Sequence, residues 1–81
     1  KMYATRFCPY CMRARALLNR KHVPFTEIAV GNDRELWAEM TALSGRTTVP
    51  QIFIGALSIG GYDDMAALDR SGELDQLLGL S

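Results

Sequence analysis

The chain has 81 residues, is 48% hydrophobic and 22% charged, and its nine basic and nine acidic residues give a formal net charge of zero. This composition predicts one globular domain over residues 1–81 and excludes an intrinsically disordered chain. Zero net charge argues against a general nucleic-acid binder, no apolar run approaches the length of a membrane span, and no signal peptide is visible. We therefore expect a cytoplasmic monomer with no nucleic-acid partner and no membrane partner.

The apolar periodicity predicts four strands and four helices. In chain order, the predicted elements are a strand at residues 1–5, a helix at 9–22, a strand at 25–30, a helix at 33–43, a strand at 51–54, a strand at 57–59, a helix capped by Asp63 or Asp64, and a short helix at 73–78. The first strand–helix–strand unit should place its strands parallel through a right-handed crossover. The short turn at Gly55 should join the next two strands as a hairpin.

The stretch Cys8-Pro9-Tyr10-Cys11 holds both cysteines of the chain, between the first predicted strand and the first predicted helix. The unpaired N–H groups and the positive dipole end of a helix N-terminus favour an anion such as a thiolate. Proline is favoured at the first helical position, which places Cys11 in the first turn, facing Cys8. Such positions lower a cysteine pKa below its free value of about 8.5, and the thiolate is the form that attacks disulfides. The pattern predicts a redox pair and no metal site, because one C-x-x-C cannot supply four zinc ligands.

The first predicted helix also carries four basic side chains outside its apolar stripe: Arg13, Arg15, Arg20 and Lys21. Such a set is most simply a solvated face, and the alternative is a surface that guides acidic partners.

Thr48-Val49-Pro50 directly precedes the third predicted strand. Proline cannot donate to a sheet, so Pro50 fits a strand start, and a trans bond is the ordinary expectation. The alternative is a cis proline facing Cys8, which would leave the backbone of Val49 open to pair with an extended thiol peptide.

Gly60-Gly61-Tyr62-Asp63-Asp64 forms a second helix start. One interpretation is simple turn and capping chemistry. The other is a carboxylate site, in which the backbone N–H groups of Tyr62 and Asp63 hold a ligand carboxylate and an aspartate holds the neighbouring ammonium.

Together with Tyr3, these segments make the chain similar to dithiol glutaredoxins. Cys-Pro-Tyr-Cys is highly specific to that family, and residues 45–54 are similar to its bacterial members. The resemblance covers nearly the whole chain. It implies an α/β, thioredoxin-like fold: a four-stranded mixed sheet in the order β-α-β-α-β-β-α-α, with helices on both faces and with Pro50 in the cis form.

The resemblance also implies the activity of a glutathione-dependent thiol–disulfide oxidoreductase. It would reduce protein disulfides and glutathione mixed disulfides through Cys8 and Cys11, and pass electrons to thiol-dependent reductases. Glutathione would be a co-substrate, and no cofactor would be tightly bound. The implied glutathione-binding residues are Arg6, Tyr10, Thr48, Val49, Pro50, Gly61, Tyr62 and Asp63.

One position departs from the family pattern. Members usually carry a lysine three residues before the first cysteine, where it steadies the thiolate and binds the glycine carboxylate of glutathione, but this chain has Thr5 there. The neighbouring Arg6 is a candidate replacement, and Trp37 occupies the place of a second polar contact. Two rival functions therefore stay open: a redoxin reduced by thioredoxin reductase, and a module that bridges an iron–sulfur cluster in a dimer.

Overall fold

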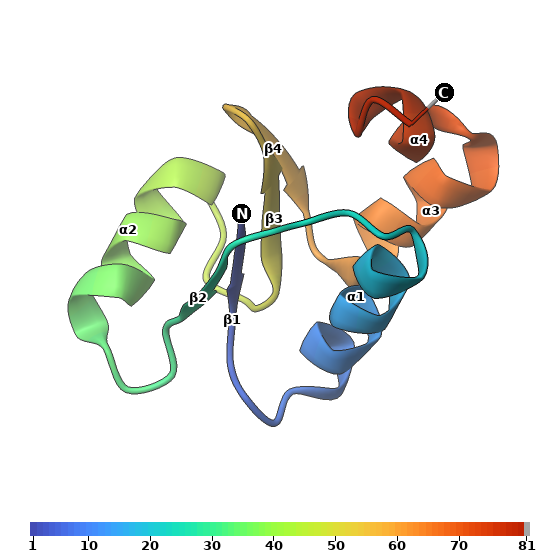
Figure 1. Cartoon of the computed structure of the whole chain (residues 1–81). Helices are drawn as coiled ribbons and strands as arrows, with labels where there is room; N and C mark the ends of the chain where they lie inside the picture. The colour runs from blue at the N-terminus through green and yellow to red at the C-terminus, as the bar shows by residue number, and fades with distance from the viewer. Residues whose placement is uncertain (81) are drawn as a thin grey trace.

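The computed structural model describes residues 1–80 and contains a mixed sheet of four strands (Figure 1). The strands are β1 (Met2–Ala4), β2 (Glu27–Ala29), β3 (Gln51–Ile54) and β4 (Leu57–Gly60), in the spatial order β2-β1-β3-β4. β1 pairs parallel with β2 and antiparallel with β3, and β3 pairs antiparallel with β4. The predicted parallel unit and hairpin are therefore confirmed.

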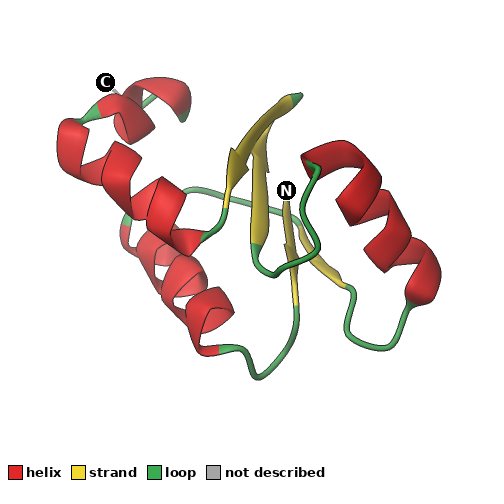
Figure 2. Ribbon diagram, turned by 180° about the vertical axis from the view of Figure 1, so that it is seen from behind, coloured by secondary structure: helices red, strands yellow, loops and turns green. Residues whose placement is uncertain are grey.

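Helices cover both faces of this sheet (Figures 1 and 2). They are α1 (Pro9–Arg20), α2 (Arg34–Ser44), α3 (Tyr62–Ser71) and α4 (Glu73–Leu77). α1 and α3 pack on one face and α2 covers the other. The α/β, thioredoxin-like fold predicted above is confirmed. None of the helices within residues 1–80 is long and apolar enough to cross a membrane.

Alternation along the strands divides the core into two clusters. Met2 and Ile52 point toward α1 and α3, where they pack with Leu17, Leu18 and Met65. The strand residues that alternate with these point toward α2 and form the second cluster. Its buried members are Tyr3, Val30, Met40 and Phe53. The Tyr3 and Phe53 rings meet edge to face at 5.6 Å, and the Tyr3 hydroxyl donates to Glu39 Oε2 at 2.8 Å. Because β1 lies between two strands, all three of its residues are buried.

Two element boundaries differ from the predictions for identifiable reasons. α1 ends at Arg20, because His22 has a left-handed backbone (φ 56°) and donates to Asn19 O, while Val23 donates to Leu18 O. This bond pattern is a Schellman motif, which ends a helix. α3 begins at Tyr62 with Gly61 as its N-cap, two residues before the start that capping by Asp63 would give.

Two of the four basic residues of α1 are not on a solvated face. Arg15 forms a two-pronged ion pair with Glu27 at 2.6 and 2.8 Å, and donates to the carbonyl of Thr5 at 3.1 Å. Lys21 contacts Asp69 and Asp75 at 2.7 and 2.6 Å. Their predicted solvation is therefore wrong: Arg15 ties α1 to β2, and Lys21 ties it to the C-terminal helices.

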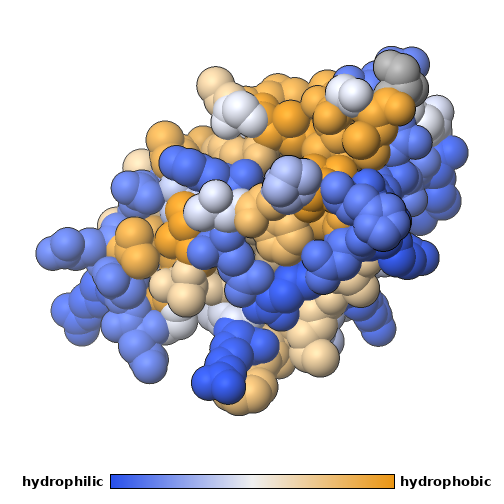
Figure 3. All heavy atoms as spheres, viewed as in Figure 1, coloured by the Kyte–Doolittle hydropathy of each residue, from blue (hydrophilic) through white to orange (hydrophobic). Residues whose placement is uncertain are grey.

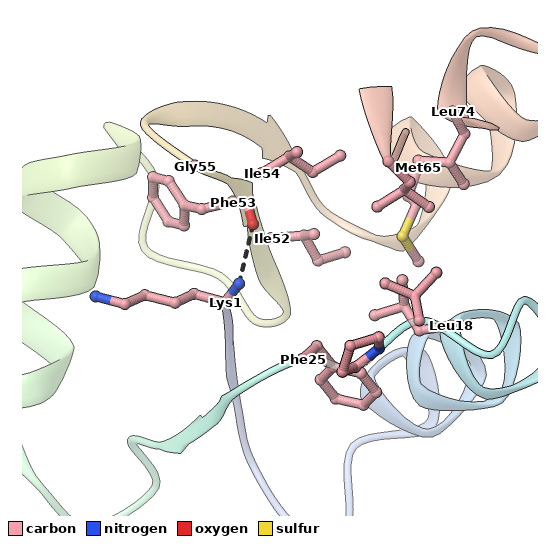
Figure 4. A pocket seen from close by; sticks show the side chains of 12 residues that line it. Lys1, Leu18, Phe25, Ile52, Phe53, Ile54, Gly55, Met65 and Leu74 are labelled. Atoms are coloured by element: carbon pink, nitrogen blue, oxygen red, sulfur yellow. Dashed lines mark hydrogen bonds between the residues drawn. The ribbon is translucent and has the colours of Figure 1, made fainter. Parts of the chain in front are cut away.

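An apolar cavity of about 180 Å³ lies at the end of the sheet where β1 begins (Figure 4). Leu18, Phe25, Met65 and Leu74 line it, and the amino group of Lys1 donates to Phe53 O at 3.0 Å. Both cysteines follow the other end of β1, so the strand separates this cavity from the thiols.

Candidate functional site

Cys8 is the N-cap of α1, with an extended backbone (φ −75°, ψ 123°), and Pro9 occupies the first helical position. The carbonyl of Cys8 accepts from the N–H of Met12 at 3.0 Å, which is the first hydrogen bond of the helix. The Cys8 side chain is half-buried and its thiol lies 3.9 Å from the carbonyl oxygen of Val49. The predicted position of Cys8 at a helix N-terminus is confirmed.

The pKa of Cys8 lies below its ordinary value. Burial raises this pKa. Hydrogen bonds from the backbone N–H groups of Cys11 and Tyr10, from the Cys11 thiol and from the Thr5 hydroxyl lower it, and their combined effect is larger than that of burial. All four donors stabilise the charged form of the sulfur. The geometry therefore favours a thiolate at Cys8.

Cys11 lies in the first turn of α1 and is 0% exposed. Burial raises the pKa of its thiol, and the neighbouring Cys8 raises it further, against a lowering contribution from the backbone N–H of Thr5. Both cysteines are free thiols. The two sulfurs are thus chemically unequal: Cys8 is exposed to partners and loses its proton first, whereas Cys11 keeps its proton behind it.

Thr5 contributes to this site although its side chain carries no charge. Its hydroxyl is a hydrogen-bond partner of both sulfurs, and Arg15 fixes its backbone through the 3.1 Å bond to its carbonyl. The sequence pattern identified Thr5 only as the place of a missing lysine. In the fold, a neutral donor stands where that cation would be.

A groove of about 380 Å³ lies between the start of α1, the segment before β3 and the start of α3. It brings together seven of the eight predicted glutathione-binding residues: Tyr10, Thr48, Val49, Pro50, Gly61, Tyr62 and Asp63. The Val49–Pro50 peptide bond is cis, as the resemblance implied. The eighth predicted residue, Arg6, is not among those that line the groove. Its guanidinium lies 5.3 Å from the centre of the Phe7 ring.

The floor of the groove is fixed by Gln51, a residue that the sequence reasoning missed. Gln51 is 0% exposed, and its amide nitrogen donates to the carbonyl of Thr48 at 2.9 Å and to the Thr48 hydroxyl at 3.3 Å. A buried side-chain amide that bonds the residue three positions before it holds that loop in one conformation. No signal in the sequence distinguished Gln51 from an ordinary strand residue.

Asp64 and Arg46 also line the groove. The sequence pattern indicated Asp64 as a candidate cap of α3, and it gave no role to Arg46. Asp64 Oδ2 accepts from the N–H of Gly61 at 2.9 Å and from Arg46 at 2.8 Å. These two contacts, the Gly61 N–H first, hold the pKa of Asp64 below its ordinary value, against a smaller raising effect of burial. The carboxylate in the third helical position thus reaches back to the N-cap, as in a capping box. Asp63, by contrast, is exposed and faces the groove.

Trp37 packs against the cluster beneath α2 and lines a separate hollow with residues 30–34. Trp37 is not among the residues that line the groove beside Cys8. Within residues 1–80, no three His, Cys, Asp or Glu side chains converge in a way that would hold a metal ion.

Comparisons with known proteins agree on one family. The family model described as "Glutaredoxin" matches residues 1–59. A glutaredoxin of Pseudomonas aeruginosa is 54% identical over 77 residues, which cover 95% of this chain and 92% of that protein. The solution structure of a glutaredoxin from Brucella melitensis is 52% identical with a TM-score of 0.85, and covers 98% of this chain and 86% of its own. The crystal structure of a buckwheat glutaredoxin–glutathione complex is 27% identical with a TM-score of 0.88, and covers 96% of this chain and 74% of its own.

Proposed function

Because the chain belongs to the glutaredoxin family, whose members are glutathione-dependent thiol–disulfide oxidoreductases, we propose that Cys8 and Cys11 are its catalytic pair and that glutathione is its co-substrate. The observation that carries this assignment is the inequality of the two thiols. The pKa of the half-exposed Cys8 is lowered by four hydrogen-bond donors despite its partial burial, while burial raises the pKa of Cys11. A nucleophile must be exposed and ionised, and a resolving thiol need only reach the first sulfur.

For a glutathionylated protein, the Cys8 thiolate attacks the glutathione sulfur of the mixed disulfide. The bond between the two sulfurs of the substrate breaks, a bond from Cys8 to glutathione forms, and the protein leaves as a thiolate. A second glutathione thiolate then attacks the glutathione sulfur on Cys8. Oxidised glutathione and the Cys8 thiolate result. In sum, the mixed disulfide and one free glutathione give the reduced protein thiol and one oxidised glutathione. Cys11 is not required in this route.

For a protein disulfide, Cys8 forms a mixed disulfide with one half of the substrate and releases the other half as a thiolate. Cys11 loses its proton and attacks Cys8, which releases the second half and leaves a Cys8–Cys11 disulfide. Two glutathione molecules restore both thiols and leave as oxidised glutathione. The raised pKa of Cys11 makes its deprotonation the demanding part of this route.

The groove described above is the proposed glutathione site. Tyr10, Thr48, Val49, Pro50, Gly61, Tyr62 and Asp63 line it, and the start of α3 offers backbone N–H groups for a carboxylate. Asp63 is the aspartate we assign to the ligand ammonium, because Asp64 is already bonded to Gly61 and Arg46. A buckwheat relative was solved in complex with glutathione, which supports glutathione as the ligand. Arg6 is a further proposed contact, for the glycine carboxylate of glutathione; its guanidinium lies over the Phe7 ring.

The remaining parts of the proposal concern partners and setting. The proposed substrates are protein disulfides and glutathionylated proteins, and the proposed electron acceptors are thiol-dependent reductases. The proposed form is a cytoplasmic monomer without a tightly bound cofactor. Thr5 in place of the usual lysine keeps thioredoxin reductase open as a second source of electrons. Reduction of a glutathione mixed disulfide with glutathione and its reductase, run beside thioredoxin reductase, discriminates between the two sources.

Serine variants test the assigned roles. Cys8→Ser is expected to abolish all activity, because the nucleophile is gone. Cys11→Ser is expected to keep the removal of glutathione from mixed disulfides and to lose most reduction of protein disulfides. Both activities are measured on each variant beside the parent. Equal loss of both in Cys11→Ser would mean that the route through Cys8 alone does not operate in this protein.

A further inference from the structure

The side chains around Cys8 include three large apolar groups that the fold leaves exposed. Phe7 is 82% exposed, Tyr10 49% and Met12 55%. Phe7 directly precedes Cys8, and the other two lie in the first turn of α1. Figure 3 shows hydrophilic and hydrophobic side chains that project together at the lower end of this face, where the turn between β1 and α1 lies. A phenylalanine this exposed contributes little to the core, so its apolar surface is left for contact with another molecule.

Two of these side chains, the Phe7 and Tyr10 rings, each have an arginine guanidinium lying over them. The Arg6 Cζ atom lies 5.3 Å from the centre of the Phe7 ring, and the Arg13 Cζ atom lies 5.5 Å from the centre of the Tyr10 ring. Stacking on a ring restricts a long side chain, but leaves the edge of its planar fork free to donate to a carboxylate. We call Arg6, Phe7, Tyr10, Met12 and Arg13 the aromatic rim.

The rim carries positive charge that no carboxylate offsets. Neither Arg6 nor Arg13 has a carboxylate oxygen within 4.0 Å anywhere in residues 1–80. Arg20, Arg34 and Arg70 share this property, but Arg6 and Arg13 differ from them in lying within five residues of Cys8 in the chain. The chain as a whole is neutral, so these two charges give the surface beside the reactive sulfur a local positive character.

The rim and the groove are different surfaces that meet at Tyr10. Arg6, Phe7, Met12 and Arg13 are absent from the residues that line the groove. In the proposed function the glutathione half of a mixed disulfide occupies the groove, so the protein half extends away from it. The rim is the exposed surface beside Cys8 that remains for the protein half.

We propose that the aromatic rim is a docking surface for acidic protein substrates, in which the Phe7 and Tyr10 rings contact apolar side chains next to the substrate cysteine. Arg13 binds a flanking carboxylate, and Arg6 does so where the glycine carboxylate of glutathione does not engage it. This inference rests on the proposed function. It assigns a substrate class to the same site: disulfides whose cysteine has aspartate or glutamate within a few residues. Each arginine at such an exposed surface contributes a factor of up to about five to the preference.

The test compares two glutathionylated peptides of equal length that differ only in glutamate or glutamine on both sides of the cysteine. A small glutathione mixed disulfide, glutathionylated 2-mercaptoethanol, reports the chemistry without the rim. Arg13→Gln is the test variant. Arg20→Gln is its matched control, because Arg20 is an exposed arginine on the same helix, seven residues on, about 10 Å farther from the site.

The parent is expected to favour the acidic peptide by about five- to twentyfold in kcat/KM at low salt, and less at high salt. Arg13→Gln is expected to lower that ratio by about three- to fivefold without a change on the small disulfide, and Arg20→Gln to leave the ratio unaltered. Equal kcat/KM for both peptides, or equal loss from the two variants, overturns the docking surface. A parent that does not reduce the small disulfide overturns the proposed function instead.

Discussion

Gly60 has a backbone that an L side chain rarely adopts, and it lies against the carboxylate that shapes the end of the groove. Its φ is 110°, and a Cβ added there would come within 2.5 Å of Asp64 Oδ2 and 3.1 Å of an Arg46 guanidinium nitrogen. Gly60→Ala is therefore expected to displace Asp64 from the Gly61 N–H as well as to strain the backbone. The two effects can be separated, because each has its own comparison variant.

The expected cost is worked from these two contributions. Backbone strain of this kind costs about 1–3 kcal/mol, and the loss of a helix cap about 0.5–2 kcal/mol. The Arg46–Asp64 pair adds little, since its side chains are 52% and 43% exposed. Gly60→Ala should then lower the free energy of unfolding by roughly 2–4 kcal/mol, a large part of the ~4–12 kcal/mol expected for a domain of this size.

Urea denaturation of five proteins, the parent, three single variants and one double variant, measures both contributions. Gly72→Ala is the strain control, because Gly72 also has a left-handed backbone (φ 85°) but no atom within 4 Å of its added Cβ, so its cost should be about 1–2 kcal/mol. Asp64→Ala removes the cap alone, and in that background Gly60→Ala should cost about 1 kcal/mol less than in the parent. The reasoning is refuted if Gly60→Ala costs the same in both backgrounds, or no more than Gly72→Ala.

Three further predictions concern the charges of the site. The rate of Cys8 alkylation against pH should have a midpoint well below the free thiol value of about 8.5, and Thr5→Val should move it upward because a hydroxyl donor to the thiolate is lost. A parent midpoint above about 8 would contradict the hydrogen-bond account. Arg6→Ala should raise the KM for a glutathionylated substrate severalfold, because an exposed carboxylate contact is worth about 1 kcal/mol, or about fivefold in affinity, and Thr5→Lys should lower it. An unchanged KM in Arg6→Ala beside a lowered one in Thr5→Lys would remove Arg6 from the site. Because the pKa of Asp64 is lowered in the fold, its stabilising contribution is present above the unfolded value of about 3.9 and is lost as the pH falls through the folded value. Asp64→Asn should therefore lose less stability than the parent between pH 5 and pH 2, measured by urea denaturation, and identical losses would disprove the linkage.

Local signals were sufficient for the order of the elements and for the helix start at Cys8. Asp33 caps α2 as its sequence position indicates, with its carboxylate accepting from the N–H of Leu36 at 3.0 Å. Pro9 and the C-x-x-C spacing likewise fixed the place of both thiols. These features depend on residues a few positions apart, which is the range over which a sequence pattern carries structural information.

The parts that could not be predicted depend on residues distant in the chain. Arg15 pairs with Glu27 across the β1–α1–β2 unit, and Arg46 pairs with Asp64 across the hairpin. The spacing of these residues in the sequence matches no helix or strand periodicity, so no local pattern indicates either pair. The hydroxyl of Thr5 acts on the sulfurs only because the turn after β1 folds back onto α1. The cis form of Pro50 came from the family resemblance alone, because residue-based reasoning favours trans.

The burial of Cys11 also determines how the protein responds to oxidants. In the proposed mechanism, peroxide would convert the half-exposed thiolate of Cys8 to a sulfenic acid, whereas the fully buried thiol of Cys11 would be shielded. Cys11 can then attack that sulfenic acid and release water, which stores the damage as a disulfide that glutathione reverses. Burial thus protects the Cys11 sulfur from oxidation to the irreversible sulfinic and sulfonic acids. Cys8 is oxidised to these acids only when the oxidant reacts with its sulfenic acid faster than Cys11 does.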